Sequence, residues 1–161
     1  MIKLITRSAK ETQAVGQLLG CAALPGDLIL LTGELGSGKT CLVQGVASGL
    51  GIQEYVRSPT FVLIAEHRGR LPLYHIDLYR LNGIREVEDI GLDEYLEAEG
   101  LCAVEWADKV MPFFPNEYLL VELIHRGTRK RELNFTPRGD RYFALLDFIQ
   151  QKLDSINLRV S

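Results

Sequence analysis

Residues 28–40 read Leu-Ile-Leu-Leu-Thr-Gly-Glu-Leu-Gly-Ser-Gly-Lys-Thr, a continuous apolar run followed by a glycine-rich turn. The run Leu28–Thr32 is apolar at successive positions, which is typical of a central strand covered by helices on both faces. Gly33–Thr40 fits the pattern Gly-x-x-x-x-Gly-Lys-[Ser/Thr] of a phosphate-binding P-loop. A helical pattern begins near Lys39 and ends at the glycines of Gly49–Gly51. Strand, loop and helix in this order predict a P-loop NTPase domain.

The loop supplies the groups that a triphosphate and its metal ion need. Gly36 and Gly38 permit backbone conformations in which successive N–H groups converge on one anion. Lys39 adds a full positive charge for the β- and γ-phosphates, and the Thr40 hydroxyl is a hard oxygen ligand suited to Mg²⁺. We therefore expect ATP and Mg²⁺ as ligands, with the nucleotide-binding residues Gly33, Glu34, Leu35, Gly36, Ser37, Gly38, Lys39, Thr40 and Cys41.

Adenine is the expected base, because the sequence lacks the element that reads guanine. Guanine-specific P-loop proteins usually carry Asn-Lys-x-Asp. No such run begins at any of the asparagines, which are Asn82, Asn116, Asn134 and Asn157.

The rest of the chain alternates strand and helix patterns. Besides Leu28–Thr32, the sequence predicts strands at Ile2–Thr6, Phe61–Glu66, Leu71–Asp77, Leu101–Glu105, Tyr118–His125 and Glu132–Thr136. It predicts a helix capped at Ser8, short helical pieces within Glu86–Glu99 that Gly91 interrupts, and a closing helix at Asp140–Ile156. The turn Arg68-Gly69 indicates an antiparallel hairpin. The expected fold is α/β: a single three-layer α/β/α P-loop NTPase domain over residues 1–161, with a mixed parallel and antiparallel sheet.

Composition and charge narrow the class of protein. The chain has 161 residues, of which 47% are hydrophobic, and a formal net charge of −3. This apolar content excludes an intrinsically disordered chain, and the acidic balance argues against a free-standing nucleic-acid clamp. No apolar run is long enough for a signal peptide or a membrane span, so a cytoplasmic location is expected. We expect Cys21, Cys41 and Cys102 to be reduced and buried, and Cys41 to serve as scaffold rather than as a nucleophile.

Two carboxylates at strand ends are the expected catalytic residues. Glu105 closes the run Leu-Cys-Ala-Val, and a P-loop ATPase needs a carboxylate at the tip of a neighbouring buried strand. Glu105 would hold the metal together with Thr40, orient the attacking water, or do both; an ordinary exposed strand-end carboxylate is the alternative. Asp77 ends its own strand and would face the γ-phosphate, unless it caps a helix or pairs with Arg80. His75 is expected to be structural, because two ligands do not make a transition-metal site.

Two further segments have an open interpretation. Ser58-Pro59-Thr60-Phe61 leads from the P-loop helix toward the next strand, where many NTPases place their first switch. Its hydroxyls would then reach the γ-phosphate or its metal, whereas composition alone favours a generic turn. Trp106 follows Glu105, and the sequence leaves open whether it docks beside the nucleotide or fills the core or its rim.

The combined motifs resemble those of the TsaE (YjeE) family of bacterial P-loop ATPases. The motifs are Gly33–Thr40, Ser58-Pro-Thr-Phe61, His75-x-Asp77-x-Tyr79-Arg80, Gly91-x-Asp93-x-Tyr95 and Glu105-Trp106. The resemblance implies a small ATPase, weakly active alone, in the biosynthesis of tRNA threonylcarbamoyladenosine. Its implied partners are the TsaD–TsaB pair, which moves a threonylcarbamoyl group onto the adenosine at position 37 of tRNAs reading ANN codons. Thr40 and Glu105 would hold Mg²⁺. Asp77 and Glu105 would support hydrolysis, and Trp106 would lie near the nucleotide.

Charged residues gather in two parts of the chain. Acidic residues concentrate in Glu86–Glu99 and basic residues in Arg126–Arg141. These are either two solvated faces or a polarised surface that docks protein partners. Because the net charge is −3, we expect negligible affinity of the isolated chain for tRNA, which would be reached only through the partners. No membrane partner is expected.

Two other functions also fit the sequence. A non-catalytic, nucleotide-gated binding module would use ATP only as a conformational ligand, and it would tolerate Asp77→Ala and Glu105→Ala. A small-molecule kinase would use the basic run Arg126–Arg131 as a phosphate-clamping lid, although no insertion for an acceptor is visible between the motifs. Labelled ATP separates hydrolysis, which yields free phosphate, from a kinase, which yields a labelled metabolite.

Overall fold

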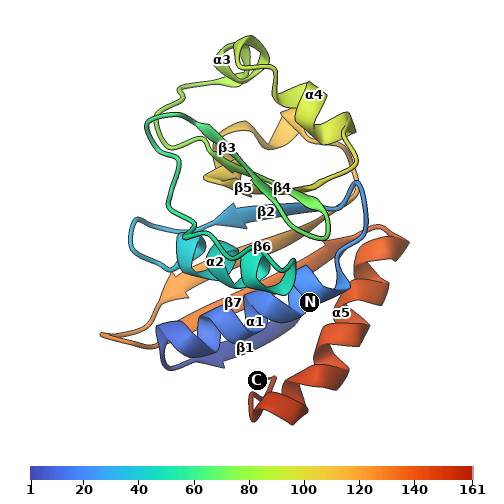
Figure 1. Cartoon of the computed structure of the whole chain (residues 1–161). Helices are drawn as coiled ribbons and strands as arrows, with labels where there is room; N and C mark the ends of the chain where they lie inside the picture. The colour runs from blue at the N-terminus through green and yellow to red at the C-terminus, as the bar shows by residue number, and fades with distance from the viewer. Residues whose placement is uncertain (161) are drawn as a thin grey trace.

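The computed structural model describes residues 1–160, and its seven strands form one sheet in the order β1-β7-β6-β2-β5-β4-β3 (Figure 1). The strands are β1 (Ile2–Thr6), β2 (Leu28–Thr32), β3 (Ile64–Arg68), β4 (Pro72–Asp77), β5 (Leu101–Glu105), β6 (Tyr118–His125) and β7 (Arg131–Arg138). The helices are α1 (Ala9–Ala22), α2 (Lys39–Gly49), α3 (Ile84–Asp89), α4 (Leu92–Glu97) and α5 (Asp140–Leu153), with the 3-10 helices η1 (Ala107–Phe113) and η2 (Asp154–Ile156). Of the helices in residues 1–160, none is both long and apolar enough to cross a bilayer.

The centre of the sheet is parallel and both of its edges are antiparallel. β2 pairs in parallel with β5 and with β6, and β4 pairs in parallel with β5. β3–β4 and β6–β7 are antiparallel pairs, and β1 pairs antiparallel with β7. The mixed sheet and the hairpin predicted at Arg68-Gly69 are therefore confirmed. Because the central strands are parallel, β2, β4 and β5 deliver the residues that follow them to the same edge of the sheet.

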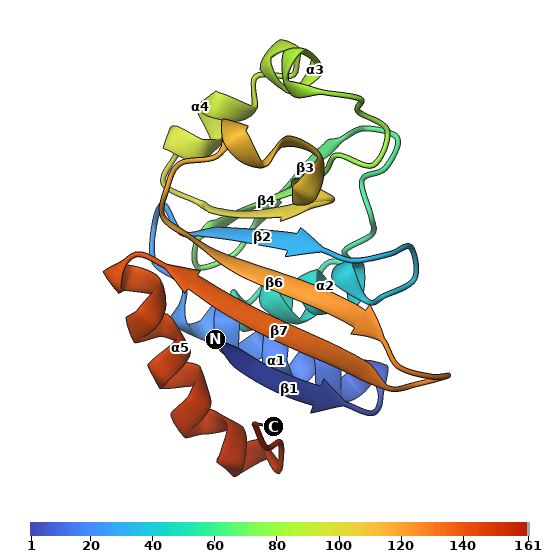
Figure 2. The same cartoon turned by 180° about the vertical axis from the view of Figure 1, so that it is seen from behind.

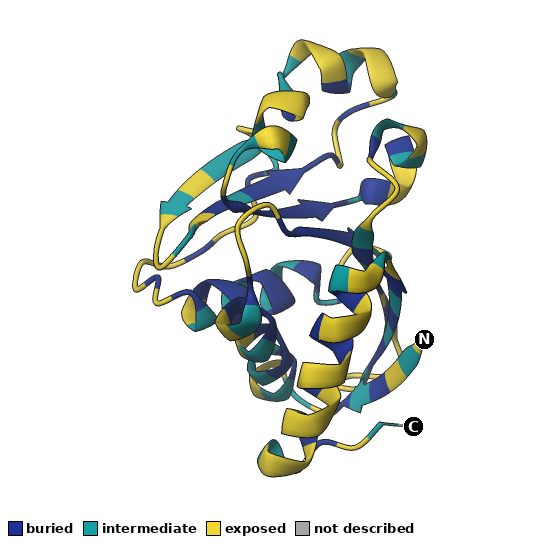
Figure 3. Ribbon diagram, turned by 90° about the vertical axis from the view of Figure 1, so that its right-hand side faces the viewer, coloured by how far each residue is buried: buried dark blue, intermediate teal, exposed yellow. Residues whose placement is uncertain are grey.

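Helices cover both faces of the sheet, each over an apolar core (Figures 1 and 2). α1, α2 and α5 pack on one face, over a core that includes Leu31 and Phe135. α3, α4 and η1 pack on the other face, over a core that includes Leu30 and Val104. In Figure 3 the central strands are buried between these layers, while the outer sides of the helices are exposed. The three-layer α/β/α architecture predicted from the sequence is confirmed.

The P-loop helix α2 lies unusually close to α1, because glycines face each other across the contact. A Cβ added at Gly16 would lie 2.2 Å from the carbonyl oxygen of Leu42, and one added at Gly45 would lie 2.1 Å from that of Gln13. Gly20 and Gly49 make equivalent approaches to the opposite backbone. No side chain fits at these positions, so the two helices pack backbone against backbone, and this contact fixes where α2 presents the P-loop.

The strand predicted at Phe61–Glu66 is partly wrong, because β3 begins only at Ile64. Leu63 has φ +69°, a conformation that no regular strand contains. Its N–H donates to the carbonyl oxygen of Pro59 at 2.6 Å, which closes a turn before the strand. The apolar residues that read as the first half of a strand therefore form the end of a loop.

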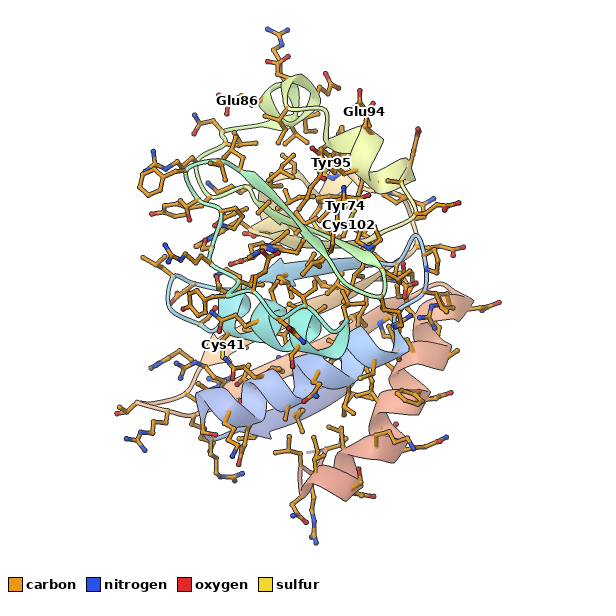
Figure 4. The ribbon with its side chains drawn as sticks, in the orientation of Figure 1. Cys41, Tyr74, Glu86, Glu94, Tyr95 and Cys102 are labelled. Atoms are coloured by element: carbon orange, nitrogen blue, oxygen red, sulfur yellow. The ribbon has the colours of Figure 1, made fainter. Side chains whose placement is uncertain are left out.

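The cysteines divide into buried and exposed thiols, and all are free, as predicted. Cys102 is buried beside Tyr74 and Tyr95 (Figure 4), and burial raises its pKa to about 12. Cys41 is half-buried, its thiol donates to the carbonyl oxygen of Ala9, and burial raises its pKa, as suits a scaffold role. Cys21, in the last turn of α1, is exposed. Only Cys102 is therefore fully buried, which corrects the prediction of three buried thiols.

Candidate functional site

The P-loop Gly33–Thr40 joins the carboxyl end of β2 to the first turn of α2. Gly33 has φ +141° and Gly38 has φ +107°, a region that favours glycine. Gly33 is also confined, because a Cβ there would lie 2.4 Å from the carbonyl oxygen of Leu123. Gly38 precedes α2 and gives it no side-chain cap, so the first N–H groups of the helix lack side-chain partners at its cap. Such a helix start is a favourable place for a phosphate group.

Lys39 is buried at the base of this loop. Its ammonium group donates to the carbonyl oxygens of Gly33 at 2.6 Å and Glu34 at 2.9 Å, and lies 4.1 Å from the ring centroid of Trp106. Burial lowers the pKa of Lys39, and the surrounding carboxylates, Glu105 foremost, oppose this shift. The loop therefore holds a partly desolvated cation whose hydrogen-bond partners are weak neutral acceptors, and a phosphate oxygen would compete well for it.

Glu105 ends β5 directly opposite the start of α2. The hydroxyl of Thr40 lies 3.0 Å from each carboxylate oxygen of Glu105. His75, on the neighbouring strand β4, hydrogen-bonds the same carboxylate through Nε2. Glu105 and His75 are both buried. Glu105 is therefore not an exposed strand-end carboxylate. It lies beside the hydroxyl of Thr40, the residue with which it is predicted to share a metal ion.

Asp77 ends β4 in register with Glu105 on β5. Its Oδ2 accepts hydrogen bonds from Ser58 Oγ at 2.6 Å and Thr60 Oγ1 at 2.9 Å, and its Oδ1 accepts one from the backbone N–H of Tyr79 at 2.9 Å. Asp77 thus neither caps a helix nor pairs with Arg80. The segment predicted as a switch is tied to this carboxylate, so the hydroxyls of Ser58 and Thr60 contact a protein group here.

A cleft of about 340 Å³ brings these groups together. Its lining residues are Leu35, Gly36, Gly38, Lys39, Thr40, Cys41, Ser58, Thr60, Asp77, Tyr79, Glu105 and Trp106. Gly33, Glu34 and Ser37, also predicted to bind the nucleotide, do not line this cleft; Gly33 and Glu34 contribute the carbonyl groups that hold Lys39. Trp106 lines the cleft and also packs against the apolar core beneath α3, α4 and η1, so its position fits both interpretations that the sequence left open.

The chemistry of the donor set fits a magnesium–nucleotide complex. Thr40, Glu105 and Asp77 offer hard oxygen atoms to the cleft, and Lys39 offers a cation. Within residues 1–160, no group of three or more His, Cys, Asp or Glu residues forms a metal site by itself. Mg²⁺ usually retains several water molecules and is bound through one or two protein groups plus substrate phosphates, which agrees with this sparse set. Thr40 and Glu105 are the residues that would hold it.

Sequence reasoning missed the contact between His75 and Glu105. The sequence predicts a structural role for His75. In the structure its Nε2 hydrogen-bonds the carboxylate of Glu105, so the residue that His75 supports is Glu105. The contact follows from the register of the two strands. His75 pairs with Ala103 and Asp77 with Glu105, so His75 and Glu105 are diagonal neighbours. Diagonal neighbours on adjacent strands are within reach of long side chains.

Comparisons with known proteins show the family of this chain. The family model of the threonylcarbamoyl adenosine biosynthesis protein TsaE matches residues 6–133. The chain belongs to the TsaE family. It is 44% identical over 147 residues to the tRNA threonylcarbamoyladenosine biosynthesis protein TsaE of Bacillus subtilis, covering 91% of this chain and 92% of that protein. It is 39% identical to the TsaE protein of Treponema pallidum, covering 82% and 98%.

A solved structure shares the fold of this chain. The crystal structure of YdiB from Bacillus subtilis superposes with a TM-score of 0.82 at 39% identity, covering 94% of this chain and 97% of that one. The family membership predicted from the motifs is thereby confirmed, and so is the α/β fold.

Proposed function

We propose that the chain binds ATP with Mg²⁺ and hydrolyses it, and that this activity supports threonylcarbamoyladenosine formation at position 37 of tRNAs reading ANN codons. The carrying observation is that polar side chains from three separate segments line one cleft: Lys39 and Thr40 from the P-loop, Asp77 from β4 and Glu105 from β5. Membership of the TsaE family supports the tRNA-modification part. The proposed partners are TsaD and TsaB, and tRNA would be reached only through them.

Binding would use the backbone of the P-loop and the charge of Lys39. The polyphosphate would lie against the N-terminus of α2, where N–H groups and the helix dipole favour an anion. The Lys39 ammonium would exchange its contacts with the carbonyl oxygens of Gly33 and Glu34 for phosphate oxygens. Trp106, whose ring lies over Lys39, would cover this contact from the side and limit the access of water.

Hydrolysis would depend on Glu105 and Asp77. Bound Mg²⁺ supplies charge neutralisation at the phosphate oxygens, and catalysis of phosphoryl transfer rests mainly on positioning and electrostatics. Thr40 and Glu105 would position the ion, while Glu105 and Asp77 would orient the attacking water at the open end of the cleft. His75 fixes the Glu105 carboxylate in place through its hydrogen bond.

The test is to measure ATP turnover and ATP affinity separately for Glu105→Gln. We expect turnover to fall by about 100-fold, because one positioned charge contributes on that order, while affinity changes by only a few-fold because the P-loop remains. Glu99→Gln, an exposed site near the start of β5, is the matched control and should keep both values. Equal losses of turnover and affinity in Glu105→Gln would show that the residue serves binding alone.

A nucleotide-gated binding module is the second candidate, and the contacts of Asp77 favour it. Oδ2 of Asp77 is held by the loop that a γ-phosphate would approach, and Oδ1 is held by the backbone N–H of Tyr79, an arrangement suited to sensing the nucleotide. The two candidates differ in the consequence of Asp77→Asn when labelled ATP is supplied with purified TsaD and TsaB. If t6A formation continues at the normal rate while release of free phosphate stops, ATP is a conformational ligand and hydrolysis is dispensable.

A further inference from the structure

One side of the cleft exposes an apolar surface, which we call the aromatic face and define as Tyr55, Phe61, Val62 and Tyr79. Their exposed fractions are 73%, 81%, 71% and 43%. Large apolar side chains are normally exposed singly, and a contiguous group of them marks a site of interaction. Phe61 and Val62 are adjacent in the loop before β3, which is an edge strand of the sheet.

The aromatic face is continuous with the nucleotide cleft. A second hollow of about 360 Å³ is lined by Tyr55, Phe61 and Val62, and Ser58 lines both this hollow and the cleft. Tyr79 lines the cleft itself. The loop before β3 and the P-loop lie on the same side of the molecule in Figure 1, and α5 lies on the opposite side. A partner seated on the aromatic face would therefore touch the end of the cleft that Asp77 occupies.

Two arginines border the aromatic face, and the carboxylate next to Tyr55, that of Glu54, is paired with His67 of the same hollow. The guanidinium group of Arg80 lies 4.2 Å from the ring centroid of Phe61, and that of Arg57 lies 5.7 Å from the ring centroid of Tyr55. Both arginines are exposed, and no carboxylate of residues 1–160 lies within 4.0 Å of either. Arginines held over aromatic rings without an acidic partner are complementary to carboxylates arriving from outside.

The surroundings favour a protein over RNA. α3 follows Tyr79 and Arg80 closely in the chain, and Figure 4 shows Glu86 and Glu94 on the adjoining helices α3 and α4. A phosphate backbone needs an extended positive field, whereas the positive charge at this face is limited to Arg57 and Arg80 and the chain has a net charge of −3. Val62 adds an aliphatic contact that stacked bases do not require. Apolar area with arginines and aromatic residues is the composition of a protein interface core.

We propose that the aromatic face docks a protein partner that presents an apolar surface bordered by Asp or Glu side chains. Ser58 and Thr60 belong to the same loop and hydrogen-bond Asp77, so docking and the state of the nucleotide site are coupled. Coupling of this kind is reciprocal: a nucleotide that changes the contacts of Asp77 changes the affinity for the partner, and the partner changes the affinity for the nucleotide by the same factor.

The probe is the purified TsaD–TsaB pair, so the test rests on the proposed function. Calorimetry measures binding of this pair to the full chain with an ATP analogue present. The double variant Tyr55→Ser/Val62→Ser removes apolar area outside the nucleotide cleft, and we expect its binding to be at least about 10-fold weaker. Arg57→Glu should weaken binding most at low salt. Phe143→Ser, an exposed aromatic site on α5, is the matched control and should bind normally. Unchanged nucleotide affinity in every variant checks that the cleft is intact.

The outcomes separate the inference from the function on which it rests. Normal binding by the double variant, or an equal loss in the control, overturns the aromatic face as the docking site and leaves the proposed function standing. A loss of tRNA binding instead of protein binding assigns the face to RNA and overturns the inference. If the unmodified chain does not bind TsaD–TsaB with any nucleotide, the partner part of the proposed function fails, and this inference fails with it.

Discussion

The two walls of the nucleotide cleft are held in different ways. The fixed wall is the P-loop and α2, and the glycines of α2 lie against the backbone of α1 with no space for a side chain. The switch wall is the loop Ser58–Leu63, which is tied to Asp77 by two hydroxyl groups and exposes Phe61 and Val62. Phosphate recognition by backbone amides needs a fixed geometry, whereas gating needs a segment with few contacts to break. The nucleotide site is therefore bounded by a rigid wall on one side and a weakly held loop on the other.

The largest effect is expected from breaking the fixed wall with Gly45→Ala. The added Cβ would lie 2.1 Å from the carbonyl oxygen of Gln13, so α1 and α2 must separate. Overpacking of this kind costs about 1–3 kcal/mol or more, which outweighs the gain of about 1 kcal/mol in helix propensity. For a net loss of about 1–2 kcal/mol in a domain of this size, we expect thermal unfolding to be about 2–8 °C lower. Gly83→Ala is the control, because a Cβ there meets nothing within 4 Å. An unchanged midpoint for Gly45→Ala would mean that the helices are not in backbone contact.

The next effect concerns the charge that the fixed wall presents. Lys39→Ala should weaken ATP binding by about 100-fold or more, since charge-assisted hydrogen bonds contribute about 1.5–3 kcal/mol each and this ammonium would make two. Calorimetry with ATP and Mg²⁺ measures the loss, and Lys10→Ala, on the exposed side of α1, serves as control. Normal ATP affinity in Lys39→Ala would contradict the geometry proposed for the phosphates.

A smaller effect is expected from releasing the switch wall. Ser58→Ala/Thr60→Ala removes both hydroxyl contacts to Asp77, and these are partly exposed, so stability should fall by only about 1 kcal/mol. Hydrogen exchange of the amides between Thr60 and Ile64 should become faster, while the amides of α2 keep their protection. Ser155→Ala, which removes a hydroxyl contact near the C-terminal end, is the control. Faster exchange in α2 as well would show that the two walls move as one body.

The carboxylates of the site are predictable from sequence because each one ends an apolar strand pattern. Asp77 and Glu105 close neighbouring parallel strands, and a parallel sheet brings such ends together. The P-loop is predictable because its backbone conformation requires glycine at fixed spacing. These features depend on local sequence and on one topological rule, so no knowledge of tertiary packing is needed to place them.

The walls themselves are much harder to predict, because their support comes from contacts between distant segments. In the sequence, Gly45 in the middle of a helix pattern only lowers the helix propensity. Its role in close packing becomes clear in the structure, where it lies opposite Gly16 of α1. Leu63 lies in a run that favours a strand, but its N–H donates to the carbonyl of Pro59 and the loop is tied to Asp77. Tertiary contacts override the local preference there.

The smallest effect tests whether polar contacts also support the sheet on the side of the fixed wall. Glu132 on β7 accepts a hydrogen bond from Arg126 at 2.9 Å and one from Asn134 at 3.0 Å, and it pairs with Lys3 at 3.5 Å. The Arg126 hydrogen bond is the main reason that the pKa of Glu132 falls from 4.5 to about 2. A carboxylate with a lowered pKa in the folded state stabilises the fold above its unfolded pKa, and this contribution is lost as the pH falls toward the folded value.

Glu132→Gln should therefore lose less stability than the unmodified chain when the pH is lowered from 7 to 3, which urea unfolding at both values measures. Glu97→Gln, at an exposed site on α4, should follow the unmodified chain. The ATP affinity of Glu132→Gln at pH 7 should be normal, because the fixed wall rests on the α1–α2 backbone contact and not on this cluster. A lower affinity would mean that polar contacts in the sheet also position the P-loop, and the difference between the two walls would then be one of degree.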